Sequence, residues 1–269
     1  MDKKAEIGLT TIIVIIIFVI SALLITTYYL TLGKVGSEAQ EGLACHLMLK
    51  VQDTTDVLPF GASTIENQCR TISKTIKAKN VYDVQVEIGN ILANSAWILN
   101  HGNIADVWNK GFFEQEKCLI LYTISFEPDK RLSEAILPAE GFNTFLTTSH
   151  YKTIDDIPFT YEEYITNHPS KGDVEVGIFI LEELDFTKSY AVAISSGKED
   201  NPVFVFSKEL MKNVGEGYLI TRIFPPATGV VVVWETAKTL WNTNAKNKDV
   251  MLFYLMPFDS AIQAGCYTR

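Results

Sequence analysis

Four cysteines are the residues of this 269-residue sequence with the clearest chemical potential. They are Cys45, Cys69, Cys118 and Cys266. No two of them are close in sequence, so the C-x-x-C spacing of a compact zinc or redox motif is missing. In an oxidising compartment an even number of cysteines fits one or two disulfide bonds, and three full pairings are possible. Buried free thiols are the alternative interpretation.

Histidines and carboxylates form the second set with potential chemistry. None of the four histidines occurs in an H-E-x-x-H or H-x-H pattern. Two of them flank an acidic loop, and one histidine with two carboxylates is a donor set that a metal ion accepts. This set comprises His150, Asp155, Asp156, Glu162, Glu163 and His168. A solvated acidic loop explains the same residues, and the sequence favours that interpretation.

Other catalytic signatures are missing from the sequence. There is no G-x-S-x-G, no phosphate-binding loop and no G-x-G-x-x-G. His101, beside Gly102, is expected to be a cation near the negative end of a helix. The sequence therefore predicts no cofactor, no metal and no catalytic residue, and a non-enzymatic protein is favoured over an enzyme.

A long uncharged segment predicts that the chain is anchored in a membrane. Ile7 to Leu32 is a run of 26 residues without a charged side chain. As a helix it would extend about 39 Å, enough to cross a hydrocarbon core of roughly 30 Å. Tyr28 and Tyr29 lie where an interfacial aromatic belt is expected. A buried core helix and a cleaved secretory peptide are the alternatives, but the run is long for either.

The flanking charges predict how the chain crosses the membrane. Lys3 and Lys4 precede the run and Lys34 follows it, which favours a cytoplasmic N-terminus. The sequence thus predicts a cytoplasmic segment at 1–6, a transmembrane helix at 7–32, a stalk helix at 33–58 and an extracytoplasmic globular domain at 59–269. The whole chain has 23 basic and 32 acidic residues, a net charge of −9, so nucleic acid is an unfavourable partner.

Periodicity predicts the elements of the outer domain. Apolar residues recur every four positions between Ala39 and Val51, as expected for the stalk helix. The apolar stripe from Val81 to Leu99 predicts a long helix, ended by Gly102. Short helices are expected at 143–148 and 161–166, and strands at 117–126, 173–181, 189–195, 202–206, 217–224 and 250–256. Residues 227–241 fit either a strand or a helix.

The order of these elements predicts the fold class. In the second half, strands follow one another without long helices between them. We therefore expect an α+β fold, in which an N-terminal transmembrane helix precedes a mainly antiparallel sheet with helices packed to one side.

Several blocks of the sequence resemble an uncharacterised group of archaeal proteins with a single N-terminal membrane anchor. The matching blocks lie within residues 69–194 and are Cys69–Thr71, Asn94–Gly102, Cys118–Phe126, Phe142–Thr166 and Leu184–Ile194. That group has cysteines at the positions of Ser95 and Leu121, and their joint absence here fits a disulfide between those positions in the relatives. The resemblance implies placement and fold, and it implies no activity.

The N-terminus also resembles the processing site of archaeal type IV pilin and archaellin precursors. In those families a basic and a small residue precede the cut, and the apolar helix follows directly. Cleavage here would fall after Ala5 and leave Glu6 as the new N-terminus. An ordinary basic flank is the alternative.

Three functional hypotheses follow from the sequence. The leading one is a non-enzymatic surface module, with the lipid bilayer as one partner and other envelope proteins or further copies of the chain as others. The second is a pilin-like filament subunit processed after Ala5. The third is a membrane-tethered hydrolase whose catalytic set converges only in space.

Overall fold

The computed structural model describes residues 41–47, 49–50, 69–99, 118–127, 132, 136–151, 159–166, 174–180, 182–197, 218–221, 232–233 and 249–268. All of these residues belong to one compact unit, Glu41–Arg269. The predicted cytoplasmic segment and transmembrane helix, at 1–6 and 7–32, lie outside them. Within the described ranges, no helix is long and apolar enough to cross a membrane.

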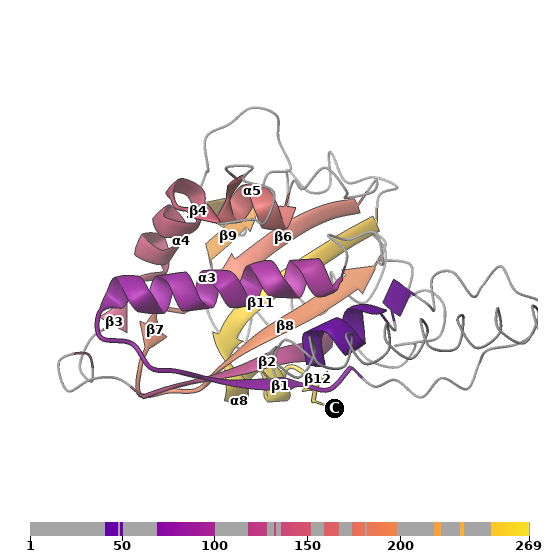
Figure 1. The fold of residues 1–269 in the computed structure, drawn as a ribbon, viewed down its shortest axis with the longest axis horizontal. Helices are drawn as coiled ribbons and strands as arrows, with labels where there is room; N and C mark the ends of the chain where they lie inside the picture. The colour runs from indigo at the N-terminus through magenta and orange to yellow at the C-terminus, as the bar shows by residue number, and fades with distance from the viewer. Residues whose placement is uncertain are drawn as a thin grey trace, which may run out of the picture. The chain divides into compact units, whose positions relative to one another are not determined.

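A mixed, mostly antiparallel sheet forms the centre of the domain (Figure 1). Its order is β1 (Ile72–Ile76), β2 (Cys118–Phe126), β8 (Tyr190–Gly197), β11 (Asp249–Pro257), β6 (Val174–Ile180), β9 (Tyr218–Thr221) and β10 (Val232–Val233). A short strand, β12 (Cys266–Tyr267), pairs with the start of β2. Two small antiparallel pairs accompany the sheet, β3 (Ile136–Leu137) with β7 (Leu184–Asp185) and β4 (His150–Tyr151) with β5 (Phe159–Thr160).

The strand directions follow from the connections. β1 and β2 are parallel neighbours because the helix α3 (Val81–Ile98) joins them as a crossover. β11 lies parallel to β6 on one side and antiparallel to β8 on the other. β2 is antiparallel to β8, and their pairing shifts register between Ile120 and Tyr122, where Leu121 is the extra residue of a β-bulge.

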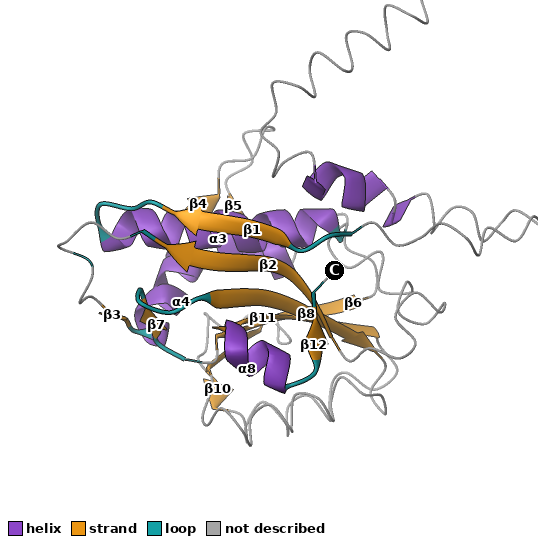
Figure 2. Cartoon of the chain, turned by 90° about the horizontal axis from the view of Figure 1, so that it is seen from below, coloured by secondary structure: helices purple, strands orange, loops and turns teal. Residues whose placement is uncertain are grey.

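Helices cover both faces of this sheet. α3, α4 (Ala139–Thr148) and α5 (Tyr161–Thr166) pack together on one face, whereas α8 (Phe258–Gln263) lies against β8, β11 and β12 on the other (Figure 2). The α+β class predicted from the sequence is confirmed, but α8 departs from the expectation that the helices pack to one side. α8 was missed because six residues after Pro257 are too few for a helical period to stand out.

The central strands are buried on both faces, which is why they read as continuous apolar runs. Val192, Ile194 and Phe253 belong to the core beneath α3, α4 and α5. Ala193 and Tyr254 alternate with them and are also buried. Each buried valine, isoleucine or phenylalanine side chain stabilises the fold by about 1.5–3 kcal/mol relative to an exposed one.

Local sequence signals fix the helix ends. The side chain of Asn80 accepts a hydrogen bond from the Asp83 amide at 2.9 Å and so caps the first turn of α3. At α5, Thr160 and Glu163 bond reciprocally to each other's backbone amides, both at 3.1 Å, as a capping box. α3 ends at Ile98, with Leu99 as its C-cap residue, and the predicted terminator Gly102 lies outside the described residues.

Candidate functional site

The structure pairs the four cysteines as Cys45–Cys69 and Cys118–Cys266. The Cα atoms of each pair are 4.7 Å apart, and all four side chains are buried. Of the three full pairings that the sequence left open, the structure therefore has this one, and no free cysteine remains. The first bond lies within a joint that connects the helical residues 41–50 to the rest of the domain, and we take this joint as the candidate functional site.

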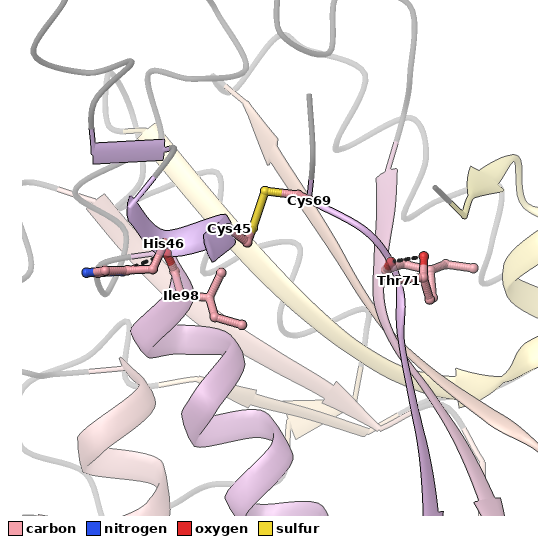
Figure 3. The surroundings of a disulfide bond; sticks show 6 residues. Cys45, His46, Cys69, Thr71 and Ile98 are labelled. Carbon is pink, nitrogen blue, oxygen red and sulfur yellow. Dashed lines mark hydrogen bonds between the residues drawn. A yellow bond between two sulfur atoms is a disulfide. The ribbon is translucent and has the colours of Figure 1, made fainter. Parts of the chain in front are cut away.

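The joint is built by residues from three segments. Cys45 comes from the helical residues 41–50, Cys69 from the segment that leads into β1, and the third segment is the C-terminal end of α3 (Figure 3). A Cβ atom added to Gly42 would lie 3.3 Å from Cδ1 of Ile98, so the two helices approach each other closely here. The segment before β1 is fixed in turn, because the Thr71 hydroxyl donates to the Ile120 carbonyl at 2.8 Å.

His46 fills the space between the two helices. Its imidazole stacks on the indole of Trp97, with ring centroids 4.2 Å apart and planes 14° apart. Its Nδ1 lies 3.0 Å from the carbonyl oxygen of Ile98, and with a proton on Nδ1 it donates to that oxygen (Figure 3). The side chain is only 6% exposed. Sequence reasoning did not single out His46, and its one signal was a position directly after Cys45, a candidate for a disulfide bond.

The electrostatics of the joint favour a neutral imidazole. Burial lowers the pKa of His46 below its ordinary value, and the charge of Lys50 lowers it further. Hydrogen bonds with the carbonyls of Ile98 and Trp97 act in the opposite direction without reversing the shift. A histidine at the C-terminal end of a helix normally gains from the helix dipole, so at this position desolvation is the larger effect.

Both disulfides lie at the same end of the sheet. Cys266 is directly opposite Cys118 at the start of β2, and Cys69 precedes β1, which runs parallel to β2. The described chain therefore starts and finishes at one end of the domain, as Figure 1 also shows. The opposite end carries the first turn of α3 and the strand pair β3–β7 (Figure 1).

The predicted histidine–carboxylate set lies partly outside the described residues. His150 is exposed on β4, opposite Thr160. Glu163 belongs to the capping box of α5, and Glu162 is buried on the same helix. The other members, Asp155, Asp156 and His168, lie outside the described residues, as do His101 and the processing candidates Ala5 and Glu6. Within the residues that the structure describes, no three His, Cys, Asp or Glu side chains are grouped to hold a metal ion.

The chain was compared with protein-family models, with curated proteins and with solved structures, and none of them matches it.

Proposed function

We propose that this chain is a single-pass membrane protein whose domain lies outside the cell and acts as a non-enzymatic binding or envelope-structural module. In this proposal residues 7–32 cross the bilayer, and helical residues 41–50 connect the anchor to the domain. The resemblance to archaeal proteins with a single anchor agrees with this placement.

One observation supports the proposal most directly. The Cys45–Cys69 bond joins the helix that follows the uncharged run to the segment that leads into β1. A mobile linker after the anchor needs no such bond. A covalent joint transmits position and force from the anchor to the domain, which suits a module that holds or presents something at a surface. Two buried disulfides also suit an oxidising exterior, since the cytosol keeps thiols reduced.

The test starts with the full-length chain, expressed with a C-terminal tag in intact cells. We expect the protein in the membrane fraction after alkaline carbonate washing, and we expect protease added to intact cells to digest the tagged domain. A matched variant carries Ile16→Lys and Val19→Asp in the uncharged run. Each central charge costs about 2.5–3.5 kcal/mol of insertion free energy, so this variant should leave the membrane fraction.

The outcomes separate the anchored module from the pilin-like alternative. A full-length product in the aqueous fraction without detergent overturns the proposal. Mass spectrometry of the mature N-terminus tests the pilin-like alternative, since a chain that begins at Glu6 indicates processing after Ala5. Crosslinking on intact cells then identifies partners, and crosslinks only between copies of the chain favour a filament or envelope lattice.

A further inference from the structure

Among the described residues, the joint between helical residues 41–50 and α3 contains one histidine, His46. The Cys45–Cys69 bond does not change its charge with pH, and the contact between Gly42 and Ile98 is apolar. His46 is buried in the joint, and its imidazole makes both the ring stack and the hydrogen bond across it.

The charged neighbours offer little compensation for an imidazolium at this position. The helix itself carries Glu41 and Lys50, both exposed, and the segment after Cys69 carries Arg70, also exposed. From Ile91 to Leu99, α3 contributes no charged side chain. Backbone carbonyls at the end of α3 supply only a partial negative charge, of roughly half an electron. A proton on His46 therefore places a positive charge in a buried stack without a carboxylate partner in the described residues.

We propose that His46 is a pH-sensitive switch, which keeps helical residues 41–50 docked on α3 while its imidazole is neutral and undocks them when it is protonated. The Cys45–Cys69 bond keeps the undocked helix attached to the domain, so the change is a local and reversible opening. Redocking is intramolecular and needs no partner, because the tether holds the helix at a high effective concentration.

The direction of the switch follows from linkage. Burial lowers the pKa of His46 in the docked state, so the undocked state takes up the proton first. Docking is therefore fully favoured above pH 6.5, the ordinary pKa of histidine, and weakens as pH falls below it. Because one proton is involved, the docking equilibrium changes by at most about tenfold per pH unit.

Hydrogen–deuterium exchange on the full-length protein in detergent micelles tests the switch between pH 7.5 and pH 5.0. After correction for intrinsic exchange, amides of residues 41–50 should lose protection on acidification, by up to about tenfold per pH unit below pH 6.5. Amides in the middle of α3, around Ile88, should keep theirs. Unchanged protection of residues 41–50 overturns the proposal, and so does a loss that proceeds in step with α3, because that is global unfolding.

Two variants sharpen the assignment. His46→Gln should remove the acid response of residues 41–50, whereas His150→Gln, at an exposed position on β4, should leave it as in the wild type. An acid response that persists in His46→Gln overturns the role of His46. If His46→Gln fails to fold, two measurements test the proposal without it. One is the exchange pattern of the wild type, and the other is the fluorescence emission of Trp97, isolated by difference from Trp97→Phe. Undocking shifts this emission to longer wavelength, whereas quenching at a fixed wavelength shows a protonated ring that stays stacked and overturns the proposal.

Discussion

Buried polar side chains in the domain are held by specific backbone and side-chain partners. The Tyr190 hydroxyl donates to the Glu183 carbonyl at 3.0 Å and accepts from the Asp185 amide at 2.7 Å. The Ser195 hydroxyl donates to the hydroxyl of Tyr254 at 3.1 Å, on the sheet face that α8 covers. Since a buried polar group left unpaired costs about 1–3 kcal/mol, these bonds fix the positions of their residues as firmly as apolar packing does.

Buried tyrosines should make the domain sensitive to alkali. Burial raises the pKa of Tyr161, Tyr164 and Tyr190 to about 12, from an ordinary value of 10. Since the folded protein binds these protons more tightly than the unfolded chain, the stability they confer is complete below pH 10 and is lost as pH rises toward 12. In a titration followed at 295 nm, these three tyrosines should ionise only as the circular dichroism of the fold disappears.

Two substitutions test the hydrogen bonding of the Tyr190 hydroxyl at neutral pH. Tyr190→Phe should lower the free energy of unfolding by about 1–3 kcal/mol at pH 7, because the Asp185 amide loses its acceptor. Tyr82→Phe is the matched control, since Tyr82 is 60% exposed and its loss should leave stability nearly unchanged. Ionisation of Tyr161, Tyr164 and Tyr190 near pH 10 with the fold intact would contradict the predicted sensitivity to alkali.

Close packing between helices determines which helical glycines can be replaced by alanine. A Cβ atom added to Gly89 on α3 would lie 2.9 Å from Cε1 of Tyr161 and 3.2 Å from Cε1 of Phe145. Both rings are buried, so neither can move away cheaply. At Gly141 on α4 the nearest atom is 3.8 Å away, an ordinary contact. The two glycines are therefore a matched pair of helical positions with opposite steric surroundings.

Alanine at these two positions should have opposite effects on stability. Gly89→Ala should lower the free energy of unfolding by about 1–3 kcal/mol through overpacking, less the gain in helix propensity. Gly141→Ala should raise it by up to about 1 kcal/mol, because only the propensity gain remains. Urea unfolding measures both. Equal effects of the two variants would show that the α3–α5 contact is looser than the structure indicates.

Long periodic elements of this fold could be predicted from the sequence, and the short helix predicted at 161–166 is confirmed as α5, whereas several other short elements were missed. The stripe from Val81 to Leu99 identified α3, and the apolar run of 117–126 identified β2. The strands predicted at 173–181, 189–195, 217–224 and 250–256 correspond to β6, β8, β9 and β11. The helix predicted at 143–148 begins earlier, at Ala139 after Pro138, and residues 232–233 of the ambiguous segment form β10. The strand predicted at 202–206 lies outside the described residues.

The strands that the sequence did not predict depend on pairing with strands that are distant in sequence. β1 places three polar residues between buried Ile72 and Ile76, and its pairing with β2 comes from the crossover through α3. β12 has only two residues, and it is a strand because it lies beside β2. Since the disulfide pairing depends on both strands, cysteine spacing alone could not supply it. The joint at His46 was unpredictable for the same reason, because 52 residues separate His46 from its hydrogen-bond partner Ile98.

At the scale of the whole molecule, the two disulfides restrain different lengths of chain. Cys45–Cys69 spans 24 residues and connects neighbouring segments at the joint. Cys118–Cys266 spans 148 residues and ties the last described strand back to the start of β2. The two loops do not overlap in sequence, so their effects on the unfolded chain should be nearly independent. The long loop encloses the central strands β6, β8 and β11, whereas the described residues of the short loop belong to no strand of the sheet.

Removing the bonds separately should therefore give distinct losses. From loop entropy, replacing Cys118 and Cys266 by alanine should cost about 5 kcal/mol, and replacing Cys45 and Cys69 about 3.5 kcal/mol. The first loss should appear as a lower midpoint of global unfolding in denaturant. The second should appear mainly at the joint, because α3 and the sheet keep their packing while residues 41–50 lose their tether. Exchange protection of residues 41–50 compared with that of β11 distinguishes the two. A short-loop variant that loses protection in β11 as strongly as at the joint would show that helical residues 41–50 are an integral part of the core.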